Sequence, residues 1–321
     1  MMDKKYQVVG FGALNWDDIR EVNEIVRPGG ETSGEVLLAS PGGSAANTIV
    51  GLSRLGVSTA FVGAIGNDEI GKRIVNDLEK EKVEQMIVSK KGYTGNCTVL
   101  VDNKGERSIY VFPEVNDTIS IKDIPESTIK VIKEVGYFYS ATFACRSYES
   151  LETQLKLSKI AQKFVFSPGT LYTNPDSKVV QEKNEVIDAL LDNTDILFLN
   201  HEEIKMRTGQ SEYSRASKKL METYDNIGTI AVTLGENGCF VKTRTDEIKI
   251  PAYKAEIIKD TVGAGDSFAA GFMYGLIKGK SPKTCGEIGN YVANKVIGKA
   301  GAREGLPSHD DAHIEKLLSQ I

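Results

Sequence analysis

Short apolar runs alternate with segments of helical spacing along the chain from about residue 128 onward. An apolar run bounded by turn residues is typical of a buried strand, whereas apolar residues three and four positions apart predict an amphipathic helix. The predicted strands are 136–141, 163–167, 195–199 and 228–233, and the predicted helices are 148–161, 177–191, 213–225, 263–278 and 282–298. Strand–helix alternation with short connections predicts a mostly parallel sheet with helices on both faces.

The first third of the chain follows the same pattern but is interrupted twice. Its predicted elements are a strand at 6–14, a helix at 43–56, a strand at 58–65, a helix at 67–82, a short strand near 84–88, and a hairpin of 95–101 with 107–112 around the turn Asp102–Gly105. The segments 15–40 and 92–118 read as β-hairpins without a crossover helix, which a small accessory sheet would explain. Because no repeat or linker is visible, we expect one continuous domain over 1–321, with a lid formed by these two segments.

Composition excludes several classes of protein. The chain has 321 residues, and its 39 basic and 44 acidic residues give a formal net charge of −5. It therefore lacks the broad basic field of nucleic-acid-binding proteins, and we expect no nucleic-acid partner. No stretch approaches the ~20 apolar residues of a membrane span, so we expect no membrane partner either. The four scattered cysteines and three histidines lack the spacing of a zinc site and favour reduced thiols in a cytoplasmic protein.

Three glycine-bearing segments have the spacing of a nucleotide-binding loop but lack part of it. Gly10 and Gly12 follow the first strand, yet Asn15 stands where a dinucleotide fingerprint needs a third glycine. The segment 66–73 has P-loop spacing, but its last residue is an arginine in place of the hydroxyl that would hold magnesium. The segment 275–281 is one residue too short and follows a helix. None of the three predicts a phosphate site by itself.

A fourth glycine segment, 260–268, has a more favourable context. Gly263 and Gly265 allow the backbone to approach a ligand closely, and an apolar helix begins directly after them. The free N–H groups and the positive end of that helix favour an anion without any lysine. A carboxylate such as Asp266 would repel phosphate there, unless it accepts the proton of a hydroxyl that attacks the phosphate. The alternative is that Asp266 only caps the helix.

The motifs of the chain resemble those of the ribokinase-like (PfkB) carbohydrate kinases. The segment Asp260-Thr261-Val262-Gly263-Ala264-Gly265-Asp266-Ser267-Phe268, with Ala270-Gly271-Phe272, resembles the C-terminal signature of that family. The others, in order, are Pro41-Gly42-Gly43-Ser44-Ala45-Ala46-Asn47, Gly66-x-Asp68-x-x-Gly71, the N-x-x-E segment Asn200-His201-Glu202-Glu203, and the T-x-G-x-x-G segment Thr233-Leu234-Gly235-Glu236-Asn237-Gly238. The resemblance spans essentially the whole chain.

The resemblance implies a fold and an activity. The fold is α/β, a three-layer αβα domain with a mostly parallel central sheet and a small β-sheet lid. The activity is transfer of the γ-phosphate of ATP to a hydroxymethyl group of a sugar, with Mg²⁺ as cofactor. Asp266 would be the general base, and the amides of Gly263, Ala264 and Gly265 would form the anion hole. Glu203, together with Asn200, would organise Mg²⁺ through water; the alternative for Glu203 is a solvated residue in the first turn of a helix.

The resemblance also implies where the nucleotide and the sugar would bind. Residues expected along the nucleotide are Thr233, Gly235 and Gly238, with Asn294 near the adenine or, alternatively, exposed on its helix. Residues expected around the sugar are Asn15, Asp17, Gly42, Gly43 and Asn47, and Asp17 could instead be half of an exposed acidic pair with Asp18. Candidates for a monovalent cation such as K⁺ are Asp260, the Val262 carbonyl and the backbone of 299–301.

The chain departs from the ribokinase pattern in two places, which leaves the substrate open. Pro113-Glu114-Val115 precedes Asn116-Asp117 in the lid, and Ser167 stands before Pro168 where many relatives carry Asp or Asn. A nucleoside is therefore an alternative substrate, and Trp16, Phe112 and Phe143 are candidates either for stacking on a base or for lid core. Two other classes remain, a catalytically silent sugar or nucleotide sensor and a nicotinamide-dependent oxidoreductase using Gly10 and Gly12. The exposed edges of a lid sheet make a homodimer through the lids a further expectation.

Overall fold

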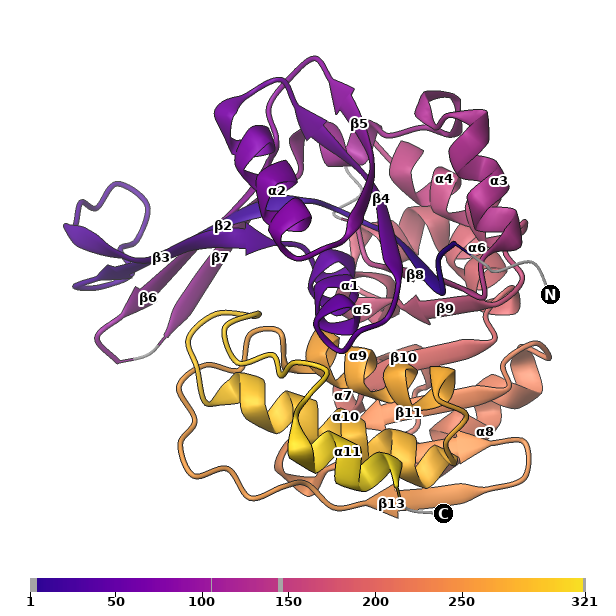
Figure 1. Ribbon diagram of the computed structural model, residues 1–321. Helices are drawn as coiled ribbons and strands as arrows, with labels where there is room; N and C mark the ends of the chain where they lie inside the picture. Colours follow the sequence, from indigo (N-terminus) through magenta and orange to yellow (C-terminus); the bar gives the residue numbers. More distant parts are fainter. Residues whose placement is uncertain (1–4, 105, 144–146, 320–321) are drawn as a thin grey trace.

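The computed structural model describes residues 5–104, 106–143 and 147–319. Across these residues the strands of the main sheet run in the order β13-β12-β11-β10-β9-β8-β1-β4-β5 (Figure 1). In that order they are Glu247–Ile250, Cys239–Thr243, Thr229–Thr233, Ile196–Asn200, Phe164–Ser167, Tyr137–Ala141, Val8–Phe11, Thr59–Gly66 and Glu84–Lys90. The seven strands from β11 to β5 are parallel, and β12 and β13 extend the sheet antiparallel.

Helices cover both faces of this sheet. Strands such as β1 and β4 are buried along their whole length, so both of their faces must be covered. Successive side chains of one strand enter opposite layers: Val8 packs with one core cluster and Val9 with the other. The first layer contains α1 (Ser44–Arg54), α2 (Glu69–Lys80), α9 (Ala264–Ile277), α10 (Pro282–Ile297) and α11 (Ala312–Leu318). The second contains α3 (Glu126–Glu134), α4 (Glu149–Ser158), α5 (Gly169–Thr173), α6 (Lys178–Asp192), α7 (His201–Thr208) and α8 (Tyr213–Thr223).

A separate small sheet projects from one side of the molecule (Figure 1). Its strands run in the order β3-β2-β6-β7, which are Gly34–Gly42, Asn15–Val22, Gly95–Asp102 and Arg107–Phe112. The segments 15–40 and 92–118 each contribute one antiparallel hairpin, and the central strands β2 and β6 pair in parallel. The predicted fold class, a mostly parallel sheet flanked by helices with a smaller separate sheet, is confirmed.

The structure corrects several details of the predicted elements. The run predicted as one strand over 6–14 ends as β1 at Phe11, and the chain enters the small sheet at Asn15. The antiparallel edge of β12 and β13 was not predicted, and neither were the short helices α3, α5, α7 and α11. The helix α7, with sequence HEEIKMRT, is short and mostly polar, so the spacing of apolar residues could not reveal it. No helix in the described part of the chain is long and apolar enough to span a bilayer.

Candidate functional site

A cavity of about 150 Å³ lies at the carboxyl ends of neighbouring parallel strands. Asn200 ends β10 and Thr233 ends β11, and both line it. This is the edge at which open α/β sheets bind ligands, because the loops that follow the strands gather there. Its lining residues are Ser44, Thr142, Ser167, Gly169, Phe198, Leu199, Asn200, Glu203, Thr233, Gly265, Asp266 and Phe268. Five of the predicted site residues therefore share one cavity.

Asp266 receives hydrogen bonds on both carboxylate oxygens. Ser44 Oγ donates to Oδ1 at 2.6 Å, and Asn47 Nδ2 donates to Oδ2 at 3.0 Å. Burial raises the pKa of Asp266, while these two donors and the positive charge of Arg303 act in the opposite direction. The carboxylate is thus held by donors from α1 while it lines the cavity. Asp266 does not merely cap the helix. The N-cap of α9 is Gly263, and no side chain makes a cap hydrogen bond there.

The start of α9 presents backbone N–H groups to the same region. Gly263 has φ 76°, and a Cβ built on it would lie 2.5 Å from Ala302 Cβ, so both the turn and the packing require glycine here. Ala264 N–H donates to Thr261 O at 3.3 Å, whereas no hydrogen bond from the amides of Gly263 and Gly265 is found among the described residues. These two amides and the positive helix end favour an anion, with Ala264 the weakest of the three predicted donors.

Asn200 and Glu203 form a reciprocal capping box at the start of α7. Asn200 Oδ1 accepts from Glu203 N–H at 2.8 Å, and Glu203 Oε2 accepts from Asn200 N–H at 2.9 Å. The N-x-x-E spacing is thus the spacing of a helix N-terminus. Glu203 is only 9% exposed, so the alternative of a solvated residue is wrong. Burial raises the pKa of Glu203, and the charge of Asp266 raises it further.

The small sheet brings a third carboxylate toward the site. Burial, together with the charge of Asp266, raises the pKa of Asp17 on β2 to about 6, although the positive charge of Arg303 opposes the rise. A Cβ on Gly42 would lie 2.0 Å from Asp17 Oδ2, so glycine is required for the Asp17 side chain to occupy this position. Asp17 is therefore not half of an exposed pair with Asp18, whose carboxylate pairs with Arg20 at 2.7 Å.

The other residues predicted around the sugar, Asn15, Gly43 and Asn47, are held by close contacts with their neighbours. Asn116 Nδ2 donates to Asn15 Oδ1 at 2.9 Å, and Asn116 also exchanges two hydrogen bonds with the Leu14 backbone. Gly43 is the N-cap of α1 with φ 108°, and a Cβ there would lie 2.2 Å from Ala13 O. Asn47 is buried and its amide contacts Asp266. The structure therefore turns Asn47 toward the carboxylate.

Apart from Thr233, the residues predicted for the nucleotide and the cation do not line this cavity. Gly238 has φ 86°, and its close neighbour is Ile250 O, so its glycine is explained by packing against β13. Asn294 on α10 is not free on the helix surface, because its Nδ2 donates to Tyr253 O at 3.0 Å. Asp260 accepts from Val262 N–H at 3.0 Å and from Gly301 N–H at 3.1 Å, which joins the two predicted cation-binding loops. Gly235 begins the short 3₁₀ turn Gly235–Asn237 after β11.

The glycines considered for a dinucleotide serve packing instead. A Cβ on Gly10 would lie 2.4 Å from Ile49 Cγ1, and one on Gly12 would lie 2.5 Å from Ala45 Cβ. They therefore let α1 pack closely on β1. The chain continues from Gly12 into β2 and not into a helix, so the oxidoreductase alternative is wrong.

The three aromatic candidates separate in the structure. Phe143 is 1% exposed and lies 5.0 Å from the Phe11 ring, measured between centroids, so it is core. Phe112 on β7 is exposed. Trp16 on β2 is partly buried, with the Arg73 guanidinium 5.8 Å from its ring centroid. Trp16 and Phe112 thus remain the candidates for contact with a ligand.

Sequence reasoning missed Arg303, which reaches this site from the loop after α10. It is 7% exposed, its Nε donates to Asn47 Oδ1 at 2.8 Å, and its Nη1 donates to Asp77 Oδ2 at 2.6 Å. A single arginine in a loop carries no periodic or spacing signal that would have identified it. Ser44 could have been found, because it lies inside the predicted segment 41–47.

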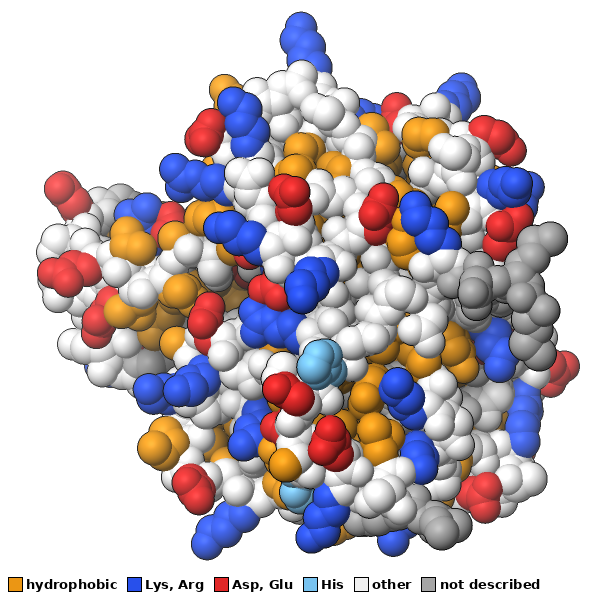
Figure 2. Space-filling model, viewed as in Figure 1, with side chains coloured by type: hydrophobic (Ala, Val, Ile, Leu, Met, Phe, Trp, Pro, Cys, Tyr) orange, Lys and Arg blue, Asp and Glu red, His pale blue; other side chains and the backbone are white. Residues whose placement is uncertain are grey.

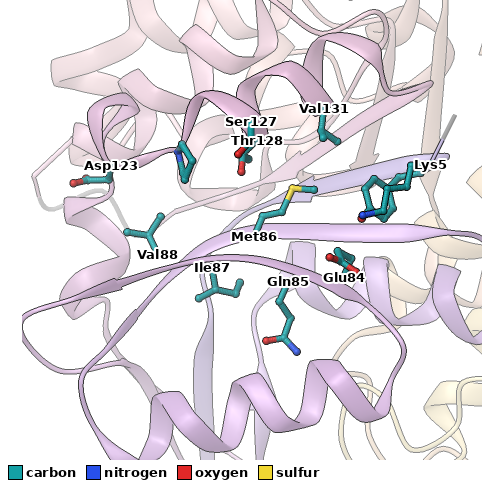
Figure 3. A pocket seen from close by; sticks show the side chains of 12 residues that line it. Lys5, Glu84, Gln85, Met86, Ile87, Val88, Asp123, Ser127, Thr128 and Val131 are labelled. Atoms are coloured by element: carbon teal, nitrogen blue, oxygen red, sulfur yellow. The ribbon is translucent and has the colours of Figure 1, made fainter.

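A larger hollow of about 480 Å³ lies far from this chemistry, between β5 and α3 (Figure 3). Met86 points across it toward Ser127 and Thr128, and Lys5, Glu84 and Asp123 stand at its rim. None of the predicted site residues lines it. The smaller cavity is therefore the candidate site, because the carboxylates of Asp266 and Glu203 and the start of α9 meet there. The described residues contain no cluster of three or more His, Cys, Asp or Glu side chains that would hold a metal alone.

Comparison with known proteins gives one consistent family. The sequence profile of the pfkB family carbohydrate kinases matches residues 6–309. An uncharacterized sugar kinase of Archaeoglobus fulgidus is 36% identical over 264 residues, covering 82% of this chain and all of that protein. A nucleoside kinase of Methanothermobacter thermautotrophicus is 27% identical over 327 residues, covering 99% and 98% of the two chains. The ribokinase of Arabidopsis thaliana, solved with ribose and ATP, superimposes with a TM-score of 0.82 at 22% identity, covering 98% and 99%.

Proposed function

The chain belongs to the pfkB family of carbohydrate kinases, and we propose that it transfers the γ-phosphate of ATP to a hydroxymethyl group of a neutral sugar. The enzyme class, a phosphotransferase acting on a hydroxyl group of a sugar or nucleoside, follows from the family. The proposal adds the donor, the acceptor group and the residues that act. The observation that carries it is Asp266, which lines the cavity at the start of α9 with both oxygens hydrogen-bonded.

In this proposal Asp266 is the general base. The substrate O–H bond breaks and its proton moves to Asp266, while the oxygen forms a new bond to the γ-phosphorus. The bond between that phosphorus and the β-phosphate oxygen breaks, and ADP leaves. The amides of Gly263 and Gly265, with Ala264, face the negative charge of the transferred group, which an N-terminal helix end stabilises. Positioning and electrostatics of this kind supply most of the catalysis in phosphoryl transfer.

Glu203 suits the role of holding Mg²⁺ through water. It is a carboxylate on the cavity wall, and oxygen ligands are those that Mg²⁺ prefers while keeping several of its waters. Bound Mg²⁺ would neutralise charge on the phosphates. The capping box with Asn200 fixes the orientation of the carboxylate. On the nucleotide side, we assign Thr233, Gly235 and Gly238 to the phosphates or ribose and Asn294 to the neighbourhood of the adenine.

The charges around the cavity favour a neutral acceptor. Asp266 and Glu203 line it, the described part of the chain places no lysine or arginine in its wall, and Asp17 approaches from β2. Among the described residues, a phosphorylated or carboxylated sugar would face this negative charge without a compensating cation in the cavity wall. In this proposal the sugar wall consists of Asn15, Asp17, Gly42, Gly43 and Asn47.

Potassium bound beside Asp260 and Val262 would activate the enzyme in this proposal, because the backbone of these residues leads directly into Gly263.

A nucleoside is the second candidate for the acceptor. One full-length relative is named a nucleoside kinase, and the small sheet carries Trp16 and the exposed Phe112. Aromatic faces stack on bases, so these two side chains favour a nucleoside. A silent sensor is a third candidate, but binding alone has no need of a base at the position of Asp266.

We further propose that the small sheet is a lid over the sugar and a dimer contact. Its edge strands expose Val36 and Leu37 on β3 and the run 109–112 on β7, and Figure 2 shows hydrophobic side chains gathered on this projection. Exposed apolar strand edges are typical of pairing surfaces.

The free thiols of Cys97, Cys239 and Cys285 fit a reducing cytoplasm.

One assay separates the acceptors. ADP release is measured with ribose, fructose, common hexoses and nucleosides, with and without potassium. We expect release with a neutral sugar, and release with nucleosides alone would replace sugar by nucleoside in the proposal. Absence of release with every acceptor, in a protein that still binds ATP, would favour the sensor. Light scattering of the same sample, compared with an Ile109→Lys variant, tests the dimer.

A further inference from the structure

Arg303 is a buried cation at the centre of a chain of hydrogen bonds. Its Nε donates to Asn47 Oδ1 at 2.8 Å, and Asn47 Nδ2 in turn donates to Asp266 Oδ2 at 3.0 Å. At its other end, Nη1 donates to Asp77 Oδ2 at 2.6 Å. This series of hydrogen bonds therefore runs from α2 through the loop after α10 and through α1 to the start of α9.

These contacts fix which way the amide of Asn47 points. In the opposite orientation, the amide nitrogen would face the guanidinium, a donor against a donor, and the amide oxygen would face the carboxylate of Asp266. Arginine has no acceptor and stays protonated at all working pH values. Arg303 therefore keeps the Asn47 oxygen toward itself and the Asn47 nitrogen toward Asp266.

We propose that Arg303 is a positioning residue of phosphoryl transfer, which orients the Asn47 amide so that Asp266 is held ionised and aimed into the cavity. The proposal rests on the proposed function, in which Asp266 is the base. Arg303 acts through Asn47 and does not line the cavity itself. The positive charge of Arg303 and the hydrogen bond from Asn47 both lower the pKa of Asp266 and thus favour its ionised form.

Arg303 is itself held from both sides. Its backbone oxygen accepts from Arg54 Nη1 at 2.6 Å, and Arg54 makes a bidentate pair with Glu81 through contacts of 2.6 and 2.8 Å. The Nη2 of Arg303 is buried and, in the described part of the chain, has no hydrogen-bond partner. An unpaired buried donor is unfavourable for folding. Stability alone therefore does not explain a guanidinium at this position, whereas orienting Asn47 does.

The groups that face Asp266 set the sign of the expected pH effect. Asp17 on β2, Glu203 on α7 and Tyr139 on β8 interact with its charge, and Arg303 is the cation among them. Loss of Arg303 leaves the carboxylate among acidic neighbours and lets the Asn47 amide turn. The proton of Asp266 is then held more tightly, so the acidic limb of kcat moves to higher pH.

The test compares Arg303→Met with the wild type by kcat, KM for the acceptor, and the pH profile of kcat. We expect kcat to fall at least about tenfold, as happens when a group that orients a metal-binding side chain is removed, with a smaller change in KM and an acidic limb displaced to higher pH. In a cycle with Asn47→Ala, the two losses in kcat should be strongly non-additive, because Arg303 acts through Asn47. Arg303→Lys, which keeps the charge without the Nε donor, should lie between Met and wild type.

Arg54→Met is the matched control, since it removes a cation of the same network that touches neither Asn47 nor Asp266. It should lower the melting temperature and leave the acidic limb in place. If Arg303→Met does not fold, Arg303→Lys and Asp77→Asn supply the same readouts. An unmoved acidic limb with additive losses would overturn the positioning role while Asp266→Asn remained inactive. An active Asp266→Asn enzyme would instead overturn the proposed function, and the positioning role with it.

Discussion

Ser44 Oγ lies 2.6 Å from Asp266 Oδ1, and this contact joins the first turns of two helices that are 222 residues apart in the sequence. Both helices, α1 and α9, have a glycine N-cap with positive φ and no side-chain cap hydrogen bond. Their first N–H groups are therefore not used by capping side chains. The two positive helix ends meet at one carboxylate, which explains how a chain of net charge −5 could hold a polyphosphate without a basic patch.

Replacement of Asp266 by asparagine should abolish turnover while ATP still binds. Asparagine keeps the size of the side chain but cannot take the proton of the attacking hydroxyl, and general bases contribute about 10²- to 10⁴-fold to kcat. The measurement is kcat by ADP release together with ATP affinity by calorimetry. Ser44→Ala is the control, because it removes one donor to Oδ1 and leaves the base. Asp266→Asn activity within tenfold of wild type would exclude the base assignment.

The position of the proposed base could be predicted from the sequence because its determinants are local. Gly263, Gly265 and Asp266 lie in one turn at the start of an apolar helix, so the proposed anion site and the proposed base share a short segment. The alternation of strands and helices was equally local, and it gave the layered fold. Sequence could not reveal that Asn47 points at Asp266, since that contact is made across 219 residues.

Alanine at Gly263 and at Gly265 should separate folding from catalysis. At Gly263 the backbone has φ 76° and the new Cβ would lie 2.5 Å from Ala302 Cβ, so Gly263→Ala should destabilise the protein by more than about 1 kcal/mol. At Gly265 the new Cβ meets nothing within 4 Å, so Gly265→Ala should leave stability unchanged or slightly improved. The measurement is the free energy of unfolding in urea.

The same pair tests the anion hole. If the transferred phosphoryl group approaches the amide of Gly265, a methyl group there should lower kcat while the fold stays intact. Removal of one such donor costs about 10²- to 10³-fold in other enzymes, and obstruction of the approach should cost at least tenfold. A fully active Gly265→Ala enzyme would place the phosphoryl group elsewhere.

Glutamine at Glu203 should keep the helix and weaken the proposed binding of Mg²⁺. The Oε1 of glutamine can still accept from Asn200 N–H, so the capping box of α7 survives in Glu203→Gln. The lost charge should raise the Mg²⁺ concentration needed for half-maximal activity about tenfold. Asn200→Ala is the converse variant, because it breaks the cap at a cost of about 1 kcal/mol and leaves the carboxylate. Equal Mg²⁺ dependence in Glu203→Gln and wild type would leave Glu203 with the capping role alone.

The N-x-x-E segment illustrates the limit of sequence reasoning at this site. Its spacing was recognised, but one pattern serves both a capping box and a metal-organising carboxylate, and only burial distinguishes a solvated glutamate from Glu203. Arg303 marks the same limit from the other side. Its three partners, Asn47, Asp77 and Arg54, come from α1 and α2, and no spacing near residue 303 encodes them.

Asp17 should make the protein less stable as the pH rises through its titration. Its pKa is raised from 3.8 to about 6 by burial, so between those values the folded state binds more protons than the unfolded chain. The free energy of unfolding that Asp17 contributes therefore falls as the pH rises from about 4 to about 6, by up to about 3 kcal/mol at 1.36 kcal/mol per pKa unit. Asp17→Asn resembles the protonated side chain and should lose this dependence. The difference in urea unfolding free energy between Asp17→Asn and wild type should be near zero at pH 4, grow to pH 6 in favour of the variant, and stay constant above. Asp18→Asn serves as the control, and a wild-type advantage that grows with pH would show that Asp17 is stabilised in its charged form.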